Sequence, residues 1–351
     1  MSVGRRDVVG VGASAGGVEA LRALVGALPP DYPGAVLVVL HVPREAPSAL
    51  AAILDRSGPL PATTATDGQT LRYGRVYVAP NDHHLLAIDD HIRLTRGPAE
   101  NGHRPAIDPL FRSIARAFGP RGIGVVLSGA RDDGAAGLAS IAARGGTTLV
   151  QDPVDALYPW MPQAALDRVA ADHIAPAAKL GGLLAGITAM EPPDRVSESD
   201  DALLDAEVAM SGLAPLTTED LAAPPAGYGC PSCGGSLFEI EQTPVPRYRC
   251  RVGHAWSPES LLDEQAIALE GALWMALRAL EEKSALSRRM ASTGLRRQSR
   301  TGTRFREIAD EAEAAGATIR RLITQIGSTV TPAADTAQPA ARPSDLPPPM
   351  R

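Results

Sequence analysis

Cysteine is scarce in this chain, with 3 residues among 351, all lying between positions 230 and 250. So few cysteines exclude a disulfide framework, and their clustering is more typical of a metal site in a reducing compartment. Aromatic residues are also few, at 4%, whereas hydrophobic residues as a whole make up 44%. We therefore expect a sizeable core in which aliphatic side chains dominate.

Long apolar runs and an excess of positive charge are absent as well. No segment approaches the ~20 uninterrupted apolar residues needed to span a bilayer, and the first residues lead directly into an apolar β-like run. The formal net charge of -6 argues against a general nucleic-acid binder, and only the stretch 295–300 is locally basic. We expect a cytoplasmic protein that neither inserts into membranes nor binds nucleic acid.

Apolar β-like runs alternate with helical patterns from residue 7 to about residue 187. This alternation indicates an α/β fold with a doubly wound, mainly parallel sheet. Two further β-rich pieces, 74–80 and 85–95, are expected to form an antiparallel excursion at one edge. The clearest patterns predict strands over 8–11, 35–40, 76–79, 124–127 and 147–150, and helices over 18–28, 47–57, 109–117 and 134–144.

The composition changes after the α/β region, which we place at 5–187. Residues 188–227 are acidic and rich in Pro, Ser and Ala, so they are interpreted as a linker with one short helix; a loosely attached part of the first domain is the alternative. The cysteines lie in a unit over 228–257. Two helical patterns over 258–327 predict a hairpin or a dimer contact, and 328–351 has the composition of a disordered tail.

The first candidate site lies where the first predicted strand ends. Residues 12–16, Gly-Ala-Ser-Ala-Gly, have the G-x-S-x-G form of a nucleophile elbow, while Gly10, Gly12 and Ala15 also fit a relaxed dinucleotide-binding pattern. A dinucleotide site expects an acidic residue at the end of the second strand, where this sequence has His41. We therefore predict that Ser14 presents its hydroxyl to a cleft at the carboxyl end of the sheet.

His41 and Asp133 are the candidate partners of Ser14. A histidine at the end of the second strand faces the same crevice, so it can take the serine proton as general base. Asp133, between an apolar strand and a helix, can hold the tautomer of the imidazole. Asp132 is the competitor for that role. Two alternatives without a catalytic role also remain open: both aspartates could cap the following helix, and His41 could be merely hydrogen-bonded at a strand end.

Four residues in the 228–257 unit have the spacing of zinc ligands. Cys230 and Cys233 form a C-x2-C knuckle, and Cys250 and His254 form a C-x3-H pair. Three thiolates and one imidazole would fill the four positions of a structural, tetrahedral zinc site, and metal binding would supply much of the folding free energy of so short a segment. An iron site or free thiols are the alternatives.

Six short motifs follow one another in order between residues 5 and 187. They are Gly-Ala-Ser-Ala-Gly-Gly at 12–17, His-Val-Pro at 41–43, Tyr-Val-Ala-Pro at 77–80 with His84, Arg-Pro-Ala-Ile-Asp-Pro-Leu-Phe at 104–111, Asp-Gly-Ala-Ala-Gly-Leu at 133–138, and Gln-Asp-Pro at 151–153 with Met161-Pro162. In this combination the region resembles the catalytic domain of bacterial chemotaxis protein-glutamate methylesterases of the CheB type.

The resemblance implies roles for the candidate residues. Ser14 would be the nucleophile, His41 the base and Asp133 its orienting acid, with no cofactor for catalysis. The substrate would be the γ-methyl ester of glutamate on chemoreceptors, released as glutamate and methanol, and some members also deamidate receptor glutamine. Backbone N–H groups near Ala15 and Ala130 would form the oxyanion hole.

The sequence also departs from the pattern of the family it resembles. Ala15 stands where Thr is usual, and Ser-Gly-Ala-Arg at 128–131 replaces Thr-Gly-Met-Gly. These changes motivate a rival hypothesis, a non-catalytic signalling adaptor; an NAD(P)-dependent oxidoreductase is a second rival. Because the α/β region begins within ten residues of the start, we expect no phosphorylatable receiver domain in this chain.

The C-terminal region resembles extensions of receiver-less members of the same family. We expect it to mediate protein contacts, with a receptor methyltransferase or other signalling proteins as candidate partners. Loop residues that could line the cleft or contact substrate carboxylates, rather than being merely solvated, are His83, His84, His103 and Arg104.

Overall fold

The computed structural model describes residues 6–45, 48–191, 202–212, 224–240, 246–292 and 299–329. The chain divides into two compact units, Met1–Glu264 and Gln265–Arg351, and each is treated by itself. Among the described residues, none of the helices combines the length and the apolar character that crossing a membrane requires.

A seven-stranded sheet in the order β3-β4-β2-β1-β7-β8-β9 forms the centre of the first unit, and all of its pairs are parallel. The five predicted strands are confirmed to within two residues at each end, whereas the three-residue strands β3 and β9 were not predicted. The strands are β1 (Val8–Ala13), β2 (Ala35–Leu40), β3 (Ala62–Thr64), β4 (Arg75–Val78), β7 (Gly122–Val126), β8 (Thr147–Gln151) and β9 (His173–Ala175).

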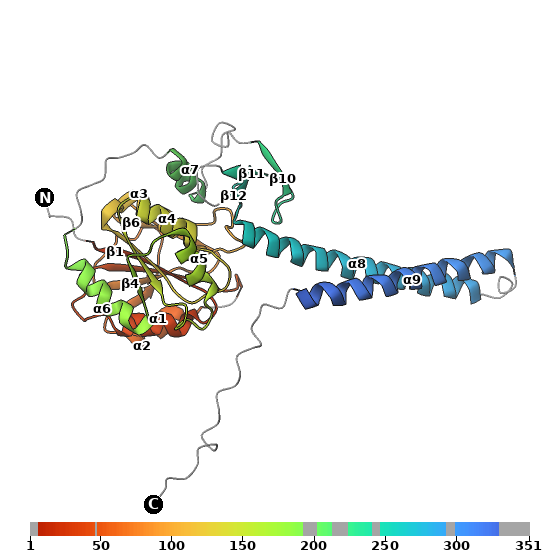
Figure 1. Cartoon of the computed structure of the whole chain (residues 1–351), viewed down its shortest axis with the longest axis horizontal. Helices are drawn as coiled ribbons and strands as arrows, with labels where there is room; N and C mark the ends of the chain where they lie inside the picture. The colour runs from red at the N-terminus through yellow and green to blue at the C-terminus, as the bar shows by residue number, and fades with distance from the viewer. Residues whose placement is uncertain are drawn as a thin grey trace, which may run out of the picture. The chain divides into compact units, whose positions relative to one another are not determined.

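Helices cover both faces of this sheet, so alternate residues of each strand enter two separate cores. In β2, Val36 and Val38 face one core, and Leu37 and Val39 face the other. Such strands are apolar throughout, as expected for a parallel sheet buried on both sides. The helices of the first face are α1 (Gly17–Gly26), α2 (Leu50–Ser57) and α6 (Ala177–Thr188), and those of the second are α3 (Ile107–Phe118), α4 (Ala135–Ala143) and α5 (Trp160–Arg168) (Figure 1). The predicted doubly wound α/β fold is confirmed.

The predicted antiparallel excursion is corrected in part. β4 belongs to the parallel sheet, whereas β5 (His84–Ile88) and β6 (His91–Thr95) pair with each other as a hairpin. The residues of β4 are buried on both faces, as a central strand requires, while β6 alternates between exposed and buried side chains. The excursion is therefore internal to residues 84–95 and does not include 74–80.

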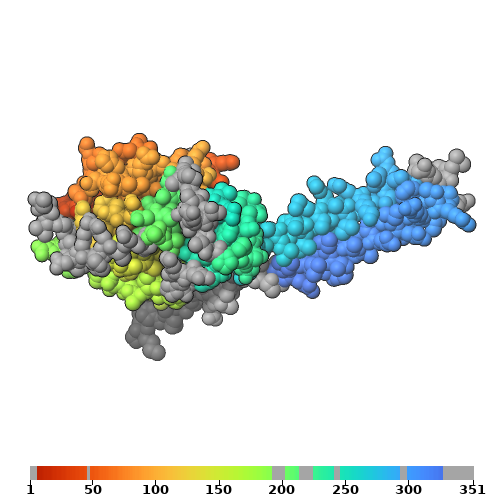
Figure 2. Space-filling model, turned by 90° about the horizontal axis from the view of Figure 1, so that it is seen from above, coloured from red at the N-terminus to blue at the C-terminus, as the bar shows by residue number. Residues whose placement is uncertain are grey.

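A helix and a small antiparallel sheet complete the first unit. The sheet has the order β10-β11-β12-β13, and its atoms lie directly against α7 and the α/β part in the space-filling view (Figure 2). The elements are α7 (Ala202–Ser211), β10 (Pro225–Gly229), β11 (Ser236–Ile240), β12 (Arg247–Cys250) and β13 (Ala255–Trp256). Residues 192–201 and 213–223 of the predicted linker, and the predicted tail from 330 onward, lie outside the described residues, and the predicted division into domains stays a prediction.

Two long helices follow, α8 (Pro258–Ser292) and α9 (Arg300–Thr329). α8 begins as predicted, because the N–H of Ser260 donates to Ser257 Oγ at 3.0 Å and Pro258 occupies the first helical position. In the second unit, Gly316 of α9 lies next to Leu277 of α8, so the two helices pack against each other.

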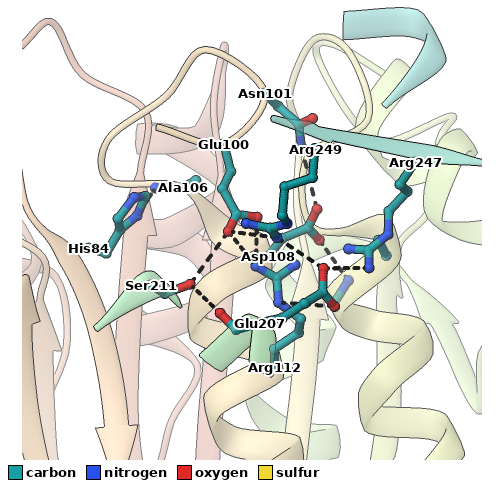
Figure 3. A network of polar contacts seen from close by, with 12 residues as sticks. His84, Glu100, Asn101, Ala106, Asp108, Arg112, Glu207, Ser211, Arg247 and Arg249 are labelled. Atoms are coloured by element: carbon teal, nitrogen blue, oxygen red, sulfur yellow. Dashed lines mark hydrogen bonds and ion pairs between the residues drawn. The ribbon is translucent and has the colours of Figure 1, made fainter. Parts of the chain in front are cut away.

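A buried ionic network joins α3, α7 and β12 (Figure 3). Arg112 donates to both carboxylate oxygens of Glu100 at 2.6 Å. Glu207 of α7 accepts from Arg247 at 2.6 Å and from Arg249 at 2.9 Å, and Arg249 also reaches Glu100 at 3.3 Å. All five side chains are at most 8% exposed, so each charge depends on its partners for the interactions that water would otherwise supply.

Replacing Glu207 by glutamine is expected to lower the free energy of unfolding by about 3–5 kcal/mol, because three buried guanidinium groups would then share only Glu100. Chemical denaturation measures the change, with Glu19→Gln on the exposed side of α1 as the control. If both variants unfold at the same denaturant concentration, Glu207 does not hold this junction together.

Candidate active site

Ser14 lies immediately after the central strand β1. Its N–H donates to the Ser128 carbonyl at 3.0 Å, and its carbonyl accepts from Gly17 N–H at 2.9 Å, which fixes the turn into α1. Gly16 adopts φ 68°, and a Cβ there would lie 2.8 Å from Ser128 Oγ. Glycine is therefore needed at 16 for both conformation and space, and the turn presents Ser14 at the carboxyl end of the sheet.

His41 follows β2, the neighbouring strand, and contacts both other candidates. Its N–H donates to the Ala13 carbonyl at 3.1 Å, its Nδ1 lies 3.1 Å from Ser14 Oγ, and its Nε2 lies 2.7 Å from Asp133 Oδ2. Because an ionised carboxylate can only accept, Nε2 carries the proton and Nδ1 is free to accept the serine hydroxyl. The structure thus brings together all three residues predicted from separate strand ends.

Asp133 is buried and surrounded by donors. Its Oδ2 accepts from His41 and from Ile107 N–H at 2.7 Å each, and its Oδ1 accepts from the Asn101 amide at 3.2 Å and Asp108 N–H at 3.3 Å. Burial by itself raises the pKa of Asp133, but the hydrogen bond and charge of His41 outweigh it and hold the pKa below its ordinary value. The carboxylate is therefore ionised at neutral pH.

Asp132, the predicted competitor, points elsewhere. It accepts from the hydroxyls of Ser257 at 2.7 Å and Ser260 at 3.0 Å, and burial raises its pKa to about 6. The helix-capping alternative is not observed either, because Gly134 with φ 95° is the N-cap of α4, and the first-turn N–H of Gly137 donates to Asp108 rather than to Asp132 or Asp133. Of the two adjacent aspartates, only Asp133 contacts His41.

The four loop residues that were predicted to line the cleft or contact substrate lie in different environments. His103 stacks on His41 with ring centroids 3.7 Å apart, and burial lowers its pKa to about 3, so it is a neutral support for the imidazole. His84 is buried and bonded to Pro98 O, and His83 contacts Asn81 O. Arg104 is engaged by Asp82 at 2.7 Å, so the predicted contact with substrate carboxylates is not supported by its position.

Two residues at the site were not predicted, Asn101 and Asp108. The Asn101-Gly102 dipeptide indicates a turn, but nothing in the sequence indicates that this turn reaches Asp133. Asp108 accepts the N–H groups of Gly134 at 3.1 Å and Gly137 at 2.6 Å, which anchors α4. Burial, together with the charge of Asp133, raises the pKa of Asp108 to about 7.

Replacing Asp108 by asparagine is expected to change how stability depends on pH. In the wild type the folded state holds the Asp108 proton more tightly than the unfolded chain, so this contribution is complete below pH ~4 and is lost as the pH rises through about 7. Relative to the variant, the free energy of unfolding should therefore fall between these pH values, by at most ~4 kcal/mol. Denaturation at pH 5 and pH 8 tests this, and parallel curves for the two proteins would contradict it.

The loop after β7 lies against Ser14. A Cβ on Gly129 would be 2.9 Å from Ser14 Cβ. Within the described residues, the backbone N–H groups of Ala15 and Ala130 form no hydrogen bond. They are therefore free to bind an oxygen that develops negative charge next to Ser14.

The four predicted metal ligands also come together. The donor atoms of Cys230, Cys233, Cys250 and His254 all lie within 4.8 Å of one another. Cys233 Sγ is 3.7 Å from Cys250 Sγ, which in turn is 3.6 Å from His254 Nδ1. Three sulfurs and one nitrogen at these separations fit around one tetrahedral metal ion.

The doubly wound parallel sheet and the Ser14-His41-Asp133 contacts define an α/β protein with the constellation of a serine hydrolase. The chain belongs to the CheB methylesterase family, whose profile matches residues 9–184.

Two curated relatives agree with this assignment. A protein-glutamate methylesterase/protein-glutamine glutaminase of Xanthomonas euvesicatoria is 38% identical over 186 residues, 52% of each chain, and one of Methanosarcina mazei is 37% identical over 183 residues, 50% of each chain. This chain thus spans about half the length of these relatives. The Thermotoga maritima CheB methylesterase catalytic domain is 30% identical and covers 51% of this chain and 97% of its own, with a TM-score of 0.49.

Proposed function

We propose that this protein is a serine esterase that hydrolyses γ-methyl esters of glutamate on chemoreceptors and also deamidates receptor glutamine. The observation that carries the proposal is the chain of contacts from Ser14 through His41 to Asp133, at 3.1 Å and 2.7 Å. The names of the relatives supply the substrate class. A methylated chemoreceptor is the proposed partner, and the cytoplasmic location stays a prediction.

The geometry supports a two-step acyl transfer. Ser14 Oγ attacks the ester carbonyl while its proton passes to His41 Nδ1, and Asp133 stabilises the imidazolium through Nε2–H. The N–H groups of Ala15 and Ala130 bind the carbonyl oxygen as it becomes negative. Methanol leaves with the proton from His41, and water, activated by the same imidazole, then releases the glutamate carboxylate; in deamidation the leaving group is ammonia.

The experiment that tests the function measures methanol released from a purified methylated receptor by the full-length protein. We expect turnover together with covalent labelling of Ser14 by a phosphonate ester, located by mass spectrometry. Folded protein that binds the receptor but releases no methanol, and that leaves Ser14 unlabelled, would favour the non-catalytic adaptor.

We further propose that Cys230, Cys233, Cys250 and His254 hold a structural zinc ion. The support is the donor set, because three thiolates and one imidazole suit zinc and leave no open position for catalysis. The indole N–H of Trp256 lies 3.4 Å from Cys230 Sγ, a contact that orients this ligand. Zinc would stabilise this small sheet and take no part in ester hydrolysis.

A further inference from the structure

The unit over residues 228–257, called here the Cys-rich unit, is joined by backbone hydrogen bonds to a loop beside the triad of Ser14, His41 and Asp133. The N–H of Asn101 donates to the Ala255 carbonyl at 2.8 Å, and the N–H of Ala255 donates to the Ala99 carbonyl at 3.3 Å. Ala255 directly follows the predicted ligand His254 and begins β13. The position of loop 99–101 is therefore tied to the segment that closes the metal site.

The side chain of Asn101 contacts both regions at once. Its amide donates to Asp133 Oδ1 at 3.2 Å, and its carbonyl accepts the N–H of Ser257 at 2.9 Å. The side chain is 4% exposed, and the residue has φ 51°, a conformation that asparagine tolerates better than most residues. One buried amide thus spans the distance between the acid of the triad and the start of α8.

The acid-bearing loop has further contacts with the same helix start. Asp132 accepts from Ser257 and Ser260, as described above, and Arg131, with φ 63°, pairs with Asp263 at 3.1 Å and Glu264 at 3.1 Å. Arg131 and Asp132 lie between Ala130 and Asp133 in the sequence. The loop that carries the triad acid is therefore held from the side of the Cys-rich unit as well as from the sheet.

The metal ligands and these contacts are only a few residues apart. Cys250 N–H donates to the His254 carbonyl at 3.0 Å, and Trp256 donates to Cys230 Sγ at 3.4 Å. When the four ligands bind a metal, residues 254–257 are fixed at both ends. His254 is then held by the metal, and the N–H of Ser257 is held by the side chain of Asn101. Loss of the metal would release the same segment.

We propose that the metal-bound Cys-rich unit positions the triad acid, with Asn101 as the positioning residue that connects the two. The proposal rests on the esterase function proposed above and extends it: turnover depends on a metal site that takes no part in the chemistry. The structural zinc site then also controls how well Asp133 holds the tautomer of His41.

The first experiment replaces Asn101 by glycine in the full-length, zinc-loaded protein. Glycine accepts a positive φ without strain, and it removes the whole side chain with its amide. We expect kcat for methanol release to fall about 10- to 100-fold with little change in KM, because the reacting groups are misplaced while the substrate contacts remain. The matched control is Asp89→Gly, which also introduces glycine at φ 51°, at the exposed turn between β5 and β6, and it should keep full activity.

A second readout follows His41 without turnover. Histidine-selective NMR of the wild type should show the Nε2–H tautomer, held by the hydrogen bond to Asp133. In the Asn101→Gly variant we expect this N–H signal to broaden or to exchange faster, with the zinc content unchanged. A residue that only stabilised the fold would not change the tautomer of His41 in protein that is folded and loaded.

The third experiment removes a ligand with Cys250→Ser. We expect a lower zinc content, the same change in the His41 signal, and a loss of kcat similar to that of Asn101→Gly. The variant that carries both Asn101→Gly and Cys250→Ser should have about the same kcat as whichever single variant has the lower kcat. The two losses should not multiply, because both changes act through the same contact.

Two results would overturn the proposal: an unchanged kcat and His41 signal in Asn101→Gly, or multiplicative losses of kcat in the double variant. If the wild type releases no methanol, the esterase function fails while the His41 signal still decides whether Asn101 positions the triad. If Cys250→Ser does not fold, the comparison of Asn101→Gly with Asp89→Gly decides.

Discussion

Replacing Ser14 by alanine is expected to lower methanol release from a methylated receptor by about 10^6-fold. The Oγ that would form the acyl-enzyme is then missing, and His41 has no hydroxyl to deprotonate. The fold should be unaffected, because the contacts that shape this turn, from Ser14 N–H to the Ser128 carbonyl and from Gly17 N–H to the Ser14 carbonyl, use the backbone.

The control for this variant is Ser140→Ala. Ser140 is also half-buried, and its hydroxyl donates to the Ala136 carbonyl within α4, at 3.2 Å. It should keep the activity of the wild type. Full activity in the Ser14→Ala protein would show that another residue supplies the nucleophile, and equal losses in both variants would point to a general loss of structure.

Replacing Asp133 by asparagine is expected to reduce kcat by about 10^4-fold while leaving the fold intact. Asp133 receives donors on both oxygens: His41 and Ile107 on Oδ2, Asn101 and Asp108 on Oδ1. An asparagine must turn an N–H toward one of these pairs. If it faces His41, the imidazole has to accept at Nε2 and carry its proton on Nδ1, where it can no longer accept from Ser14.

The measurement combines steady-state methanol release with histidine NMR, which should show the tautomer change directly. Asp67→Asn serves as the control, since the carboxylate of Asp67 is exposed, accepts from Leu94 N–H and pairs with Arg93, far from His41 in its contacts. A variant of Asp133 that turns over at nearly the wild-type rate would mean that this carboxylate does not orient His41.

Most of the fold could be predicted because its signals are local. Strands buried on both faces are continuous apolar runs, such as 35–40, and the helices between them show the spacing of a single covered face. The strands β3 and β9 were missed because three residues carry too little pattern, and two of the three residues of β3 are exposed. The placement of 74–80 was wrong because an apolar run does not reveal whether its partner strand is parallel.

The site was predictable to the extent that sheet topology places residues. Once β1, β2 and β7 are parallel neighbours, the segments that follow them meet at one edge, and this brings together Ser14 and His41, directly after their strands, and Asp133, in the loop after β7. The support around them was only partly predictable. His103 was predicted as a residue that could line the cleft, but neither its stacking on His41 nor the contact of Asn101 with Asp133 was. Both residues come from a long loop between β6 and α3, and no pattern along the chain specifies that this loop folds back over the imidazole.

The sequence by itself determined the alternation of strands and helices, the turn that carries Ser14 and the spacing of the four predicted metal ligands, because each depends on residues close together along the chain. Only the tertiary structure decided which aspartate contacts His41, and that Glu100, Glu207 and three arginines form one buried network. It also decided that Asn101 connects the Cys-rich unit to the triad. Those contacts join residues that are far apart in sequence, and their geometry is fixed by packing and desolvation once the whole unit has folded.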